Sequence, residues 1–246
     1  MAPVIVTVRL SVPLVVTLAP VSDVHRPLSN IPAVPLTPRL PPESGAFLTW
    51  LDYRQAGEPA GPNDVDLVVN ANVLYCLARY GRLDTPGAAE AVHLIDAVVA
   101  RGLHRTHPDQ LGDYYPANFA FHYAVSRAWR EGPVPGLGPA VERLADHVER
   151  TALSTPDGTV YWDNGAPHLN TALAVLTLMN AERQTPLIDK AVQYLIDQQD
   201  RESGGWAAGG FFVARTEAGP RFVWTSSSLT TALAFEALCR CALVAP

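Results

Sequence analysis

The sequence predicts an all-α protein, an α/α-barrel or toroid of about four helical hairpins, closed or incomplete, that follows an extended N-terminal arm. Two observations lead to this prediction. Helical patterns occur in pairs after residue 46, an amphipathic helix followed by one that is apolar almost all round. The apolar partners begin near residues 66, 118, 170 and 228. A repeat of roughly fifty residues is typical of folds that stack one helical unit several times.

The arm comprises residues 1–46, which carry nine of the 22 prolines. Proline fixes φ and removes a backbone donor, so we expect this segment to be extended or polyproline-like. Its apolar stretch, residues 4–18, is interrupted by Arg9 and Pro13. It is too short to span a bilayer and matches a signal peptide poorly, so no integral membrane span is expected. The repeat domain then covers residues 47–246.

Proline, glycine and aspartate separate the expected helices at the positions where helices stop and restart. The four expected pairs are Phe47–Gln55 with Asp66–Tyr80, Ala88–Arg101 with Asn118–Arg130, Pro139–Thr151 with Asn170–Ala181, and Pro186–Gln199 with Ser228–Ala242. A helix that is apolar on every face must be buried on every face. The second helices should therefore form an inner ring inside the amphipathic ones. No strand pair is expected after residue 46.

Composition excludes some classes of partner. The chain has 246 residues, is 48% hydrophobic and carries a formal net charge of −6. No basic stripe is present, so nucleic acid is not an expected partner. Cys76, Cys239 and Cys241 lie among aliphatic residues, as expected for small buried hydrophobes in a reducing, cytoplasmic setting.

All connections from an outer to an inner helix lie at one end of such a barrel, so the inner-helix starts should meet there. These starts are rich in carboxylates, amides and aromatic rings, a combination that favours a ligand site above an apolar core. The expected catalytic residues are Asp64, Asp66 and His168. The expected substrate-binding residues are Asn70, Asp113, Tyr114, Tyr115, His122, Trp162, Asp163, Asn170, Trp206, Trp224 and Thr230.

Several of these residues also allow a purely structural interpretation. Asp64 or Asp66 can cap a helix by accepting a backbone N–H, and Asn70 shares a helix face with Asp66. His122 sits in a hydrophobic helix, where a hydrogen-bonded core histidine and an acid–base partner are both possible. The aromatic residues can equally be buried side chains that only pack in the hydrophobic core.

The segment Tyr194-Leu195-x3-Gln199-x4-Gly204-Gly205-Trp206 is similar to the glutamine–tryptophan repeat of squalene–hopene cyclases and related terpenoid cyclases. Residues 50–55 and 157–162 resemble partial copies of this repeat. The resemblance covers roughly residues 47–242 and implies an α/α-barrel in which the repeat joins outer to inner helices.

Asp64-Val65-Asp66-Leu67 resembles three positions of the Asp-x-Asp-Asp motif of class II terpene cyclases, with Leu67 in place of the last aspartate. The resemblance implies that Asp66 protonates an alkene or epoxide and starts a cationic cascade. An acid of this kind must be un-ionised, and burial beside a like charge raises the pKa of a carboxyl group. Aromatic rings would stabilise the developing carbocation.

Three functions are therefore considered. The first is a terpenoid-cyclase-like enzyme acting on an apolar isoprenoid or polyene. The second is a carbohydrate-active α/α-barrel that uses paired carboxylates and aromatic platforms. The third is a non-catalytic helical-repeat module that binds a ligand or a protein. The Leu, Val, Ala and Phe of the inner helices favour an apolar small-molecule substrate.

No metal and no cofactor are expected. His104, His107 and Asp109 lack a further ligand nearby in the sequence, and no phosphate loop or dinucleotide motif is present. In the related prenyltransferases zinc ligands stand at inner-helix starts, whereas the cysteines of this chain lie deep inside helices. Four hairpins are fewer than the six of a complete toroid. An incomplete ring, an arm that closes the gap, or a homodimer would each account for the difference.

Overall fold

A computed structural model describes residues 44–49, 65–112, 114–115, 119–214 and 222–244 of the chain. The described part is mostly helical and contains two small antiparallel sheets. Residues 1–43 of the N-terminal arm, Asp64, Asp113 and Asn118 lie outside the described residues.

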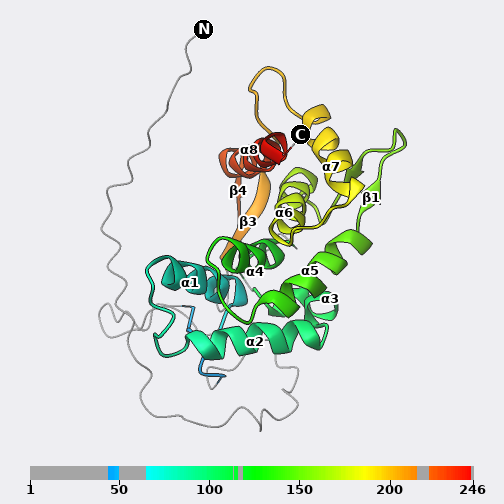
Figure 1. Cartoon of the computed structure of the whole chain (residues 1–246). Coiled ribbons are helices and arrows are strands. Elements are labelled where there is room, and N and C mark those ends of the chain that lie inside the picture. The colour runs from blue at the N-terminus through cyan, green and yellow to red at the C-terminus, as the bar shows by residue number, and fades with distance from the viewer. Residues whose placement is uncertain (1–43, 50–64, 113, 116–118, 215–221, 245–246) are drawn as a thin grey trace.

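Four helices pack one after another and form a layer that we call the inner layer. They are α1 (Leu67–Arg79), α4 (Ala120–Arg130), α6 (Pro167–Asn180) and α8 (Ser227–Val244), which leaves Phe235 and Leu243 exposed and, contrary to the expectation from the sequence, is not buried on every face. Each begins and ends within a few residues of the expected boundaries. The central helix α6 is buried along nearly its whole length, because apolar residues occupy most of its circumference. In Figure 1 these helices follow one another from α1 in the lower part to α8 in the upper part.

Three of the four expected amphipathic helices are described and form a second layer, which we call the outer layer. They are α2 (Ala88–Ala100), α5 (Gly138–Arg150) and α7 (Pro186–Asp197). Helix α2 packs against α1 and α5, α5 packs against α4 and α6, and α7 packs against α6 and α8. The hydrophobic core lies between the two layers. Two short elements, α3 (Leu103–Thr106) and η3 (Pro108–Gln110), connect α2 to the segment before α4.

Two tryptophans link the layers in the same way. The Trp162 indole N–H donates to the carbonyl of Val148 in α5 at 2.8 Å, and its backbone N–H donates to Oγ1 of Thr171 in α6 at 3.1 Å. The Trp206 indole N–H donates to Leu195 in α7 at 2.8 Å, and its backbone N–H donates to Oγ1 of Thr231 in α8 at 3.1 Å. The outer and inner helices of two successive pairs are thus joined by equivalent bonds.

The expectation of no strand pair is wrong. Strands β1 (Leu153–Ser154) and β2 (Val160–Tyr161) form a short ladder, and β3 (Gly209–Ala214) pairs with β4 (Phe222–Ser226) in a longer one that shifts register between Gly210 and Phe212. Aromatic and β-branched residues fill the longer hairpin and suit a half-buried pleated surface.

The expected first helix, Phe47–Gln55, is wrong at its start. Phe47–Thr49 are not helical, and residues 50–55 lie outside the described part. A tertiary contact explains why Phe47 is not helical. The side chain of Asn70 accepts the Phe47 N–H and donates to the Phe47 C=O, each at 2.9 Å. None of the described helices is long and apolar enough to cross a membrane.

Candidate functional site

Asp66 stands at the start of α1 and caps it. Its Oδ1 accepts the backbone N–H groups of Val68 at 2.8 Å and Val69 at 3.0 Å. Its own N–H donates to Thr49 Oγ1 at 3.0 Å, and only 2% of the residue is exposed. Gly112 packs directly against this carboxyl group, since a Cβ there would lie 3.5 Å from Asp66 Oδ2. The carboxyl group is therefore buried and oriented by its surroundings.

Asn70 and Thr230 occupy similar places one turn into inner helices, and both bind backbone. Asn70 donates to the Asp66 carbonyl at 2.8 Å in addition to its two bonds with Phe47. Thr230 donates to the carbonyl of Ser226 at 3.0 Å and accepts the N–H of Gly209 at 3.1 Å. These two predicted substrate-binding residues hold the connecting segments against the inner helices.

Asn170 holds the corresponding place in α6 but differs from Asn70 and Thr230 in its hydrogen bonding. It is fully buried, and neither Nδ2 nor Oδ1 has a hydrogen-bond partner within the described structure. A buried amide without partners costs about 1–3 kcal/mol for each unsatisfied group. Of the amides predicted for the site and described, Asn70 is satisfied and Asn170 is not.

Four aromatic rings meet beside the start of α1. The Tyr114 ring stacks on Phe212 with centroids 5.9 Å apart, and the Tyr115 ring meets Phe211 edge-on at 5.6 Å. The N–H of Val213 donates to the Tyr114 carbonyl at 2.8 Å and ties the segment before α4 to β3. Burial raises the pKa of the Tyr115 phenol, and the nearby charge of Asp66 raises it further. The structure therefore brings Asp66 and both predicted tyrosines together.

An open cavity of about 310 Å³ lies beside these rings; we name it the aromatic pocket. Its lining residues are Phe211, Phe212, Trp224, Thr225, Ser226 and Leu229. Trp224 is 67% exposed, so this predicted residue places its indole at the open cavity rather than in the core. The hydroxyl groups of Thr225 and Ser226 add a few polar groups to an otherwise apolar wall. Phe211 and Phe212 were not expected because β3 was not expected, and Leu229 of α8 was expected only as a helix residue.

The other predicted residues do not line the aromatic pocket. Trp162 and Trp206 are buried links between layers, and Asp163 is an exposed turn residue whose Oδ1 accepts the Gly165 N–H at 2.7 Å. His168 is half-buried near Tyr194, with ring centroids 6.2 Å apart. Burial lowers the pKa of His168, and a hydrogen bond with Gln198 partly opposes that shift. No described contact joins His168 to Asp66.

His122 belongs to a histidine cluster that sequence reasoning missed. Its Nε2 lies 3.0 Å from Nδ1 of His147, and the His104 ring centroid lies 5.9 Å from that of His122 and 5.2 Å from that of His147. Burial, followed by the charges of His147, Arg105 and Arg150, lowers the pKa of His104 to about 4. The three rings come from α3, α4 and α5, so no sequence spacing indicated the cluster.

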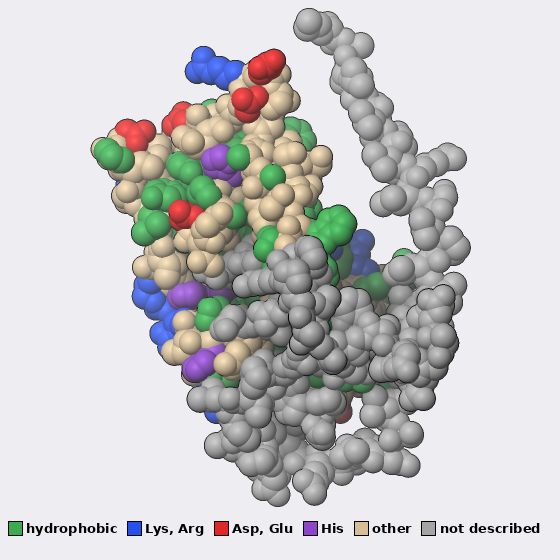
Figure 2. Space-filling view, turned by 180° about the vertical axis from the view of Figure 1, so that it is seen from behind, with side chains coloured by type: hydrophobic (Ala, Val, Ile, Leu, Met, Phe, Trp, Pro, Cys, Tyr) green, Lys and Arg blue, Asp and Glu red, His purple; other side chains and the backbone are tan. Residues whose placement is uncertain are grey.

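The described residues contain no group of histidine, cysteine and acidic side chains arranged to hold a metal ion. Figure 2 shows acidic and basic side chains scattered among hydrophobic and polar ones on the described surface of that face.

Comparisons of the chain with protein families, with curated proteins and with solved structures find no match, so its function is inferred from the geometry of the site.

Proposed function

We propose that this chain binds an apolar, isoprenoid-like small molecule at the aromatic pocket and acts on it as a terpenoid-cyclase-like enzyme with Asp66 as the acid. The observation that carries the proposal is the composition of the pocket wall. Three aromatic side chains and Leu229 surround a cavity with only two hydroxyl groups. Small-molecule sites are mostly apolar with a few placed polar groups, which is the composition found here.

The position of Asp66 supports the acid role. The residue is buried near Tyr115, and Tyr115 packs on Phe211 of the pocket wall. The effect of Asp66 on the Tyr115 pKa is that of an ionised carboxylate, whereas the acid role uses the protonated form. Aromatic faces next to an acid are suited to stabilise a carbocation that protonation would create. For proton transfer, substrate must reach the Asp66 carboxyl group, and the acid must be protonated while Oδ1 still caps α1.

The proposal extends to the fold. Two layers of helices, joined by equivalent tryptophan bonds in successive pairs, are the arrangement expected for part of an α/α-toroid. In such a fold the inner-helix starts, where the aromatic pocket lies, face a common cavity.

Binding is tested with two matched variants. Trp224 and Phe235 are both exposed aromatic residues, at 67% and 62%, but only Trp224 lines the pocket. We expect Trp224→Ala to weaken binding of geranylgeraniol about tenfold or more, because one buried aromatic contact is lost. Phe235→Ala should bind like the wild type. Equal affinity in all three proteins would contradict the assignment of this pocket.

Mass spectrometry of molecules that co-purify with the chain distinguishes the other two functions. An apolar polyene agrees with the proposal, whereas a bound oligosaccharide would favour the carbohydrate-active alternative. Tight binding of polyenes without any turnover would favour a non-catalytic binding module.

A further inference from the structure

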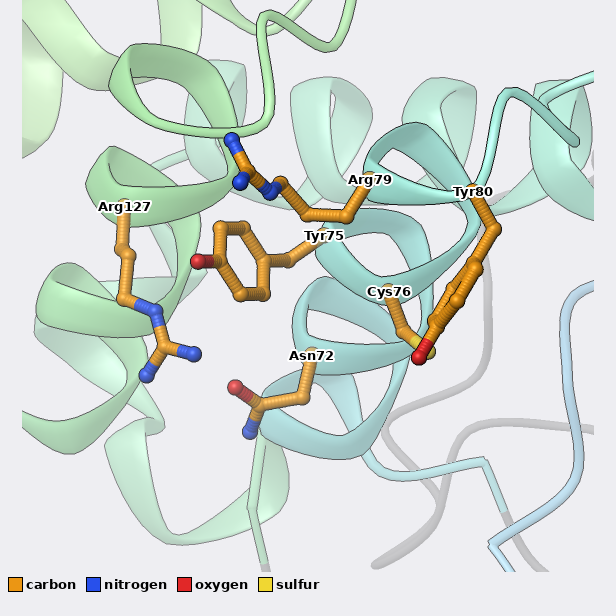
Figure 3. A pocket seen from close by; sticks show the side chains of 6 residues that line it. All are labelled: Asn72, Tyr75, Cys76, Arg79, Tyr80 and Arg127. Carbon is orange, nitrogen blue, oxygen red and sulfur yellow. The ribbon is translucent and has the colours of Figure 1, made fainter. Parts of the chain in front are cut away.

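Residues of α1 and its C-cap, with Arg127 of α4, line a second open cavity, of about 540 Å³, which we name the arginine pocket. Its lining residues are Asn72, Tyr75, Cys76, Arg79, Tyr80 and Arg127. Figure 3 shows the Arg79 side chain extending from α1 toward α4, with Tyr75 beside the Arg127 guanidinium. Among the described residues, only these two guanidinium groups bring a formal charge to the lining, and no carboxylate does.

Arg127 is held in a fixed orientation. Its guanidinium carbon lies 4.1 Å from the centroid of the Tyr75 ring, a cation–π distance. Tyr75 is itself supported by Gly132, where a Cβ would lie 3.2 Å from the ring. The Nε of Arg127 lies 3.8 Å from Glu131, at the long end of an ion pair.

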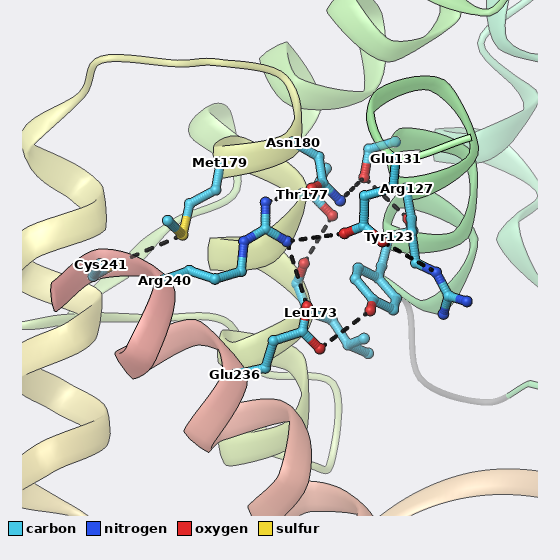
Figure 4. A network of polar contacts seen from close by, with 11 residues as sticks. Tyr123, Arg127, Glu131, Leu173, Thr177, Met179, Asn180, Glu236, Arg240 and Cys241 are labelled. Atoms are coloured by element: carbon cyan, nitrogen blue, oxygen red, sulfur yellow. Dashed lines mark hydrogen bonds and ion pairs between the residues drawn. The ribbon is translucent and has the colours of Figure 1, made fainter. Parts of the chain in front are cut away.

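Glu131 contacts a second arginine besides Arg127. Figure 4 shows the polar network in which Glu131 also contacts Arg240, at 3.3 Å. Arg240 further contacts Glu236 at 3.4 Å and donates to Asn180 at 2.7 Å. The network therefore pairs the guanidinium groups of Arg127 and Arg240 with two carboxylates, and the Arg127 side chain also lines the pocket.

Arg79 is exposed and makes no ion pair with the described part of the chain. It stands in the last turn of α1, as Arg127 does in α4. The helix macrodipole favours a cation at such a position. That preference explains an arginine near the end of each helix. Both side chains, with Tyr75 between their guanidinium groups in Figure 3, line the same cavity as Asn72.

We propose that the arginine pocket binds a multiply charged oxyanion of the phosphate-ester class. The two guanidinium groups, the Tyr75 phenol and the Asn72 amide provide donors from two helices. A single carboxylate has two oxygens and is satisfied by one guanidinium fork, whereas a phosphate ester or diphosphate has enough oxygens for all four groups. This site lies at the opposite end of α1 from Asp66 and is independent of the function proposed above.

Inorganic pyrophosphate is the probe, and calorimetry gives its affinity. We expect Arg79→Gln to weaken binding about tenfold, because one charge-assisted contact is lost. Arg101→Gln is the matched control, since Arg101 is also an exposed arginine at a helix C-terminus but does not line the pocket. Trp224→Ala should bind pyrophosphate like the wild type. An equal loss in Arg79→Gln and Arg101→Gln would overturn the proposal.

Cys76 gives a second readout inside the pocket. Pyrophosphate should slow alkylation of Cys76 by iodoacetamide severalfold while leaving Cys239, on α8, unchanged. Potassium chloride at the same ionic strength should not protect Cys76. Equal protection by chloride would indicate general screening and overturn the site, and tighter binding of citrate than of pyrophosphate would overturn the phosphate class.

Discussion

Asp66 combines two properties that a single substitution can separate. Its Oδ1 caps α1 through two backbone N–H groups, and its buried carboxyl group lies beside Tyr115. Asparagine can accept the same backbone bonds but cannot deliver a proton as an acid does. Asp66→Asn therefore preserves the cap and removes the acid.

Removing the cap should cost stability. We expect Asp66→Ala to lower the free energy of unfolding by about 1–2 kcal/mol, because two helix N–H groups lose their acceptor in a buried place. Asp66→Asn should lie within about 0.5 kcal/mol of the wild type. Urea denaturation measures both. A larger loss in the asparagine variant would show that the negative charge itself stabilises the start of α1.

Asn70 and Asn170 should respond oppositely to the same substitution. Asn70 makes three hydrogen bonds to backbone, so we expect Asn70→Leu to destabilise the fold by about 2 kcal/mol or more. Asn170 makes none with the described residues, so Asn170→Leu should be neutral or stabilising. Thermal and urea unfolding compare the pair. A marked loss in Asn170→Leu would mean that its amide has a partner, such as a buried water.

At the scale of elements, α3, α4 and α5 meet through the histidine cluster. We expect this cluster to make the free energy of unfolding depend on pH. The pKa of His104 falls from 6.5 to about 4 on folding, so the unfolded chain binds more protons between these values. The free energy of unfolding therefore has its full value above pH 6.5, where His104 is neutral in both states. It decreases as the pH falls from 6.5 toward 4. The shift corresponds to roughly 3 kcal/mol at most.

Urea unfolding between pH 7 and pH 5 tests this prediction, since most carboxylates stay ionised there. His104→Gln should flatten the fall in stability across the range. His93→Gln is the control, because His93 is an exposed histidine of α2. An unchanged pH dependence in His104→Gln would contradict a neutral buried imidazole.

The tryptophan links belong to the same scale. Trp162→Phe and Trp206→Phe should each lower the free energy of unfolding by about 2–4 kcal/mol, because each removes a buried indole bond and leaves a cavity. Trp224→Phe should change it by less than about 0.5 kcal/mol, since the indole is mostly exposed. Calorimetric unfolding gives all three values. Strongly unequal losses at Trp162 and Trp206 would argue against equivalent roles.

Helices α1, α2, α4, α5, α6, α7 and α8 could be predicted from the sequence, because their apolar periodicity is long and proline, glycine or aspartate marks their ends. The hairpin β3–β4 was missed, because its strands are short and the ladder shifts register beside Gly210. The pocket wall at Phe211 and Phe212 was missed with it. His104, His122 and His147 meet only through tertiary packing, which no local pattern encodes.

At the scale of the whole molecule, the inner row α1, α4, α6 and α8 has distinct sites at its two ends. The aromatic pocket is lined by β3, β4 and the start of α8, and the arginine pocket is lined by the middle and end of α1 and by Arg127 of α4. Closure of the row by a homodimer or by the N-terminal arm, and a cytoplasmic location, stay predictions from the sequence. So does His168 as a second catalytic group.

The most direct measurement is product analysis by gas chromatography and mass spectrometry after incubation of the chain with geranylgeraniol or squalene. We predict cyclic products from the wild type and none from Asp66→Asn, with both proteins folded by circular dichroism and binding the polyene equally. Full cyclisation by Asp66→Asn would contradict the acid role of Asp66. Binding without products in the wild type would contradict the cyclase function itself.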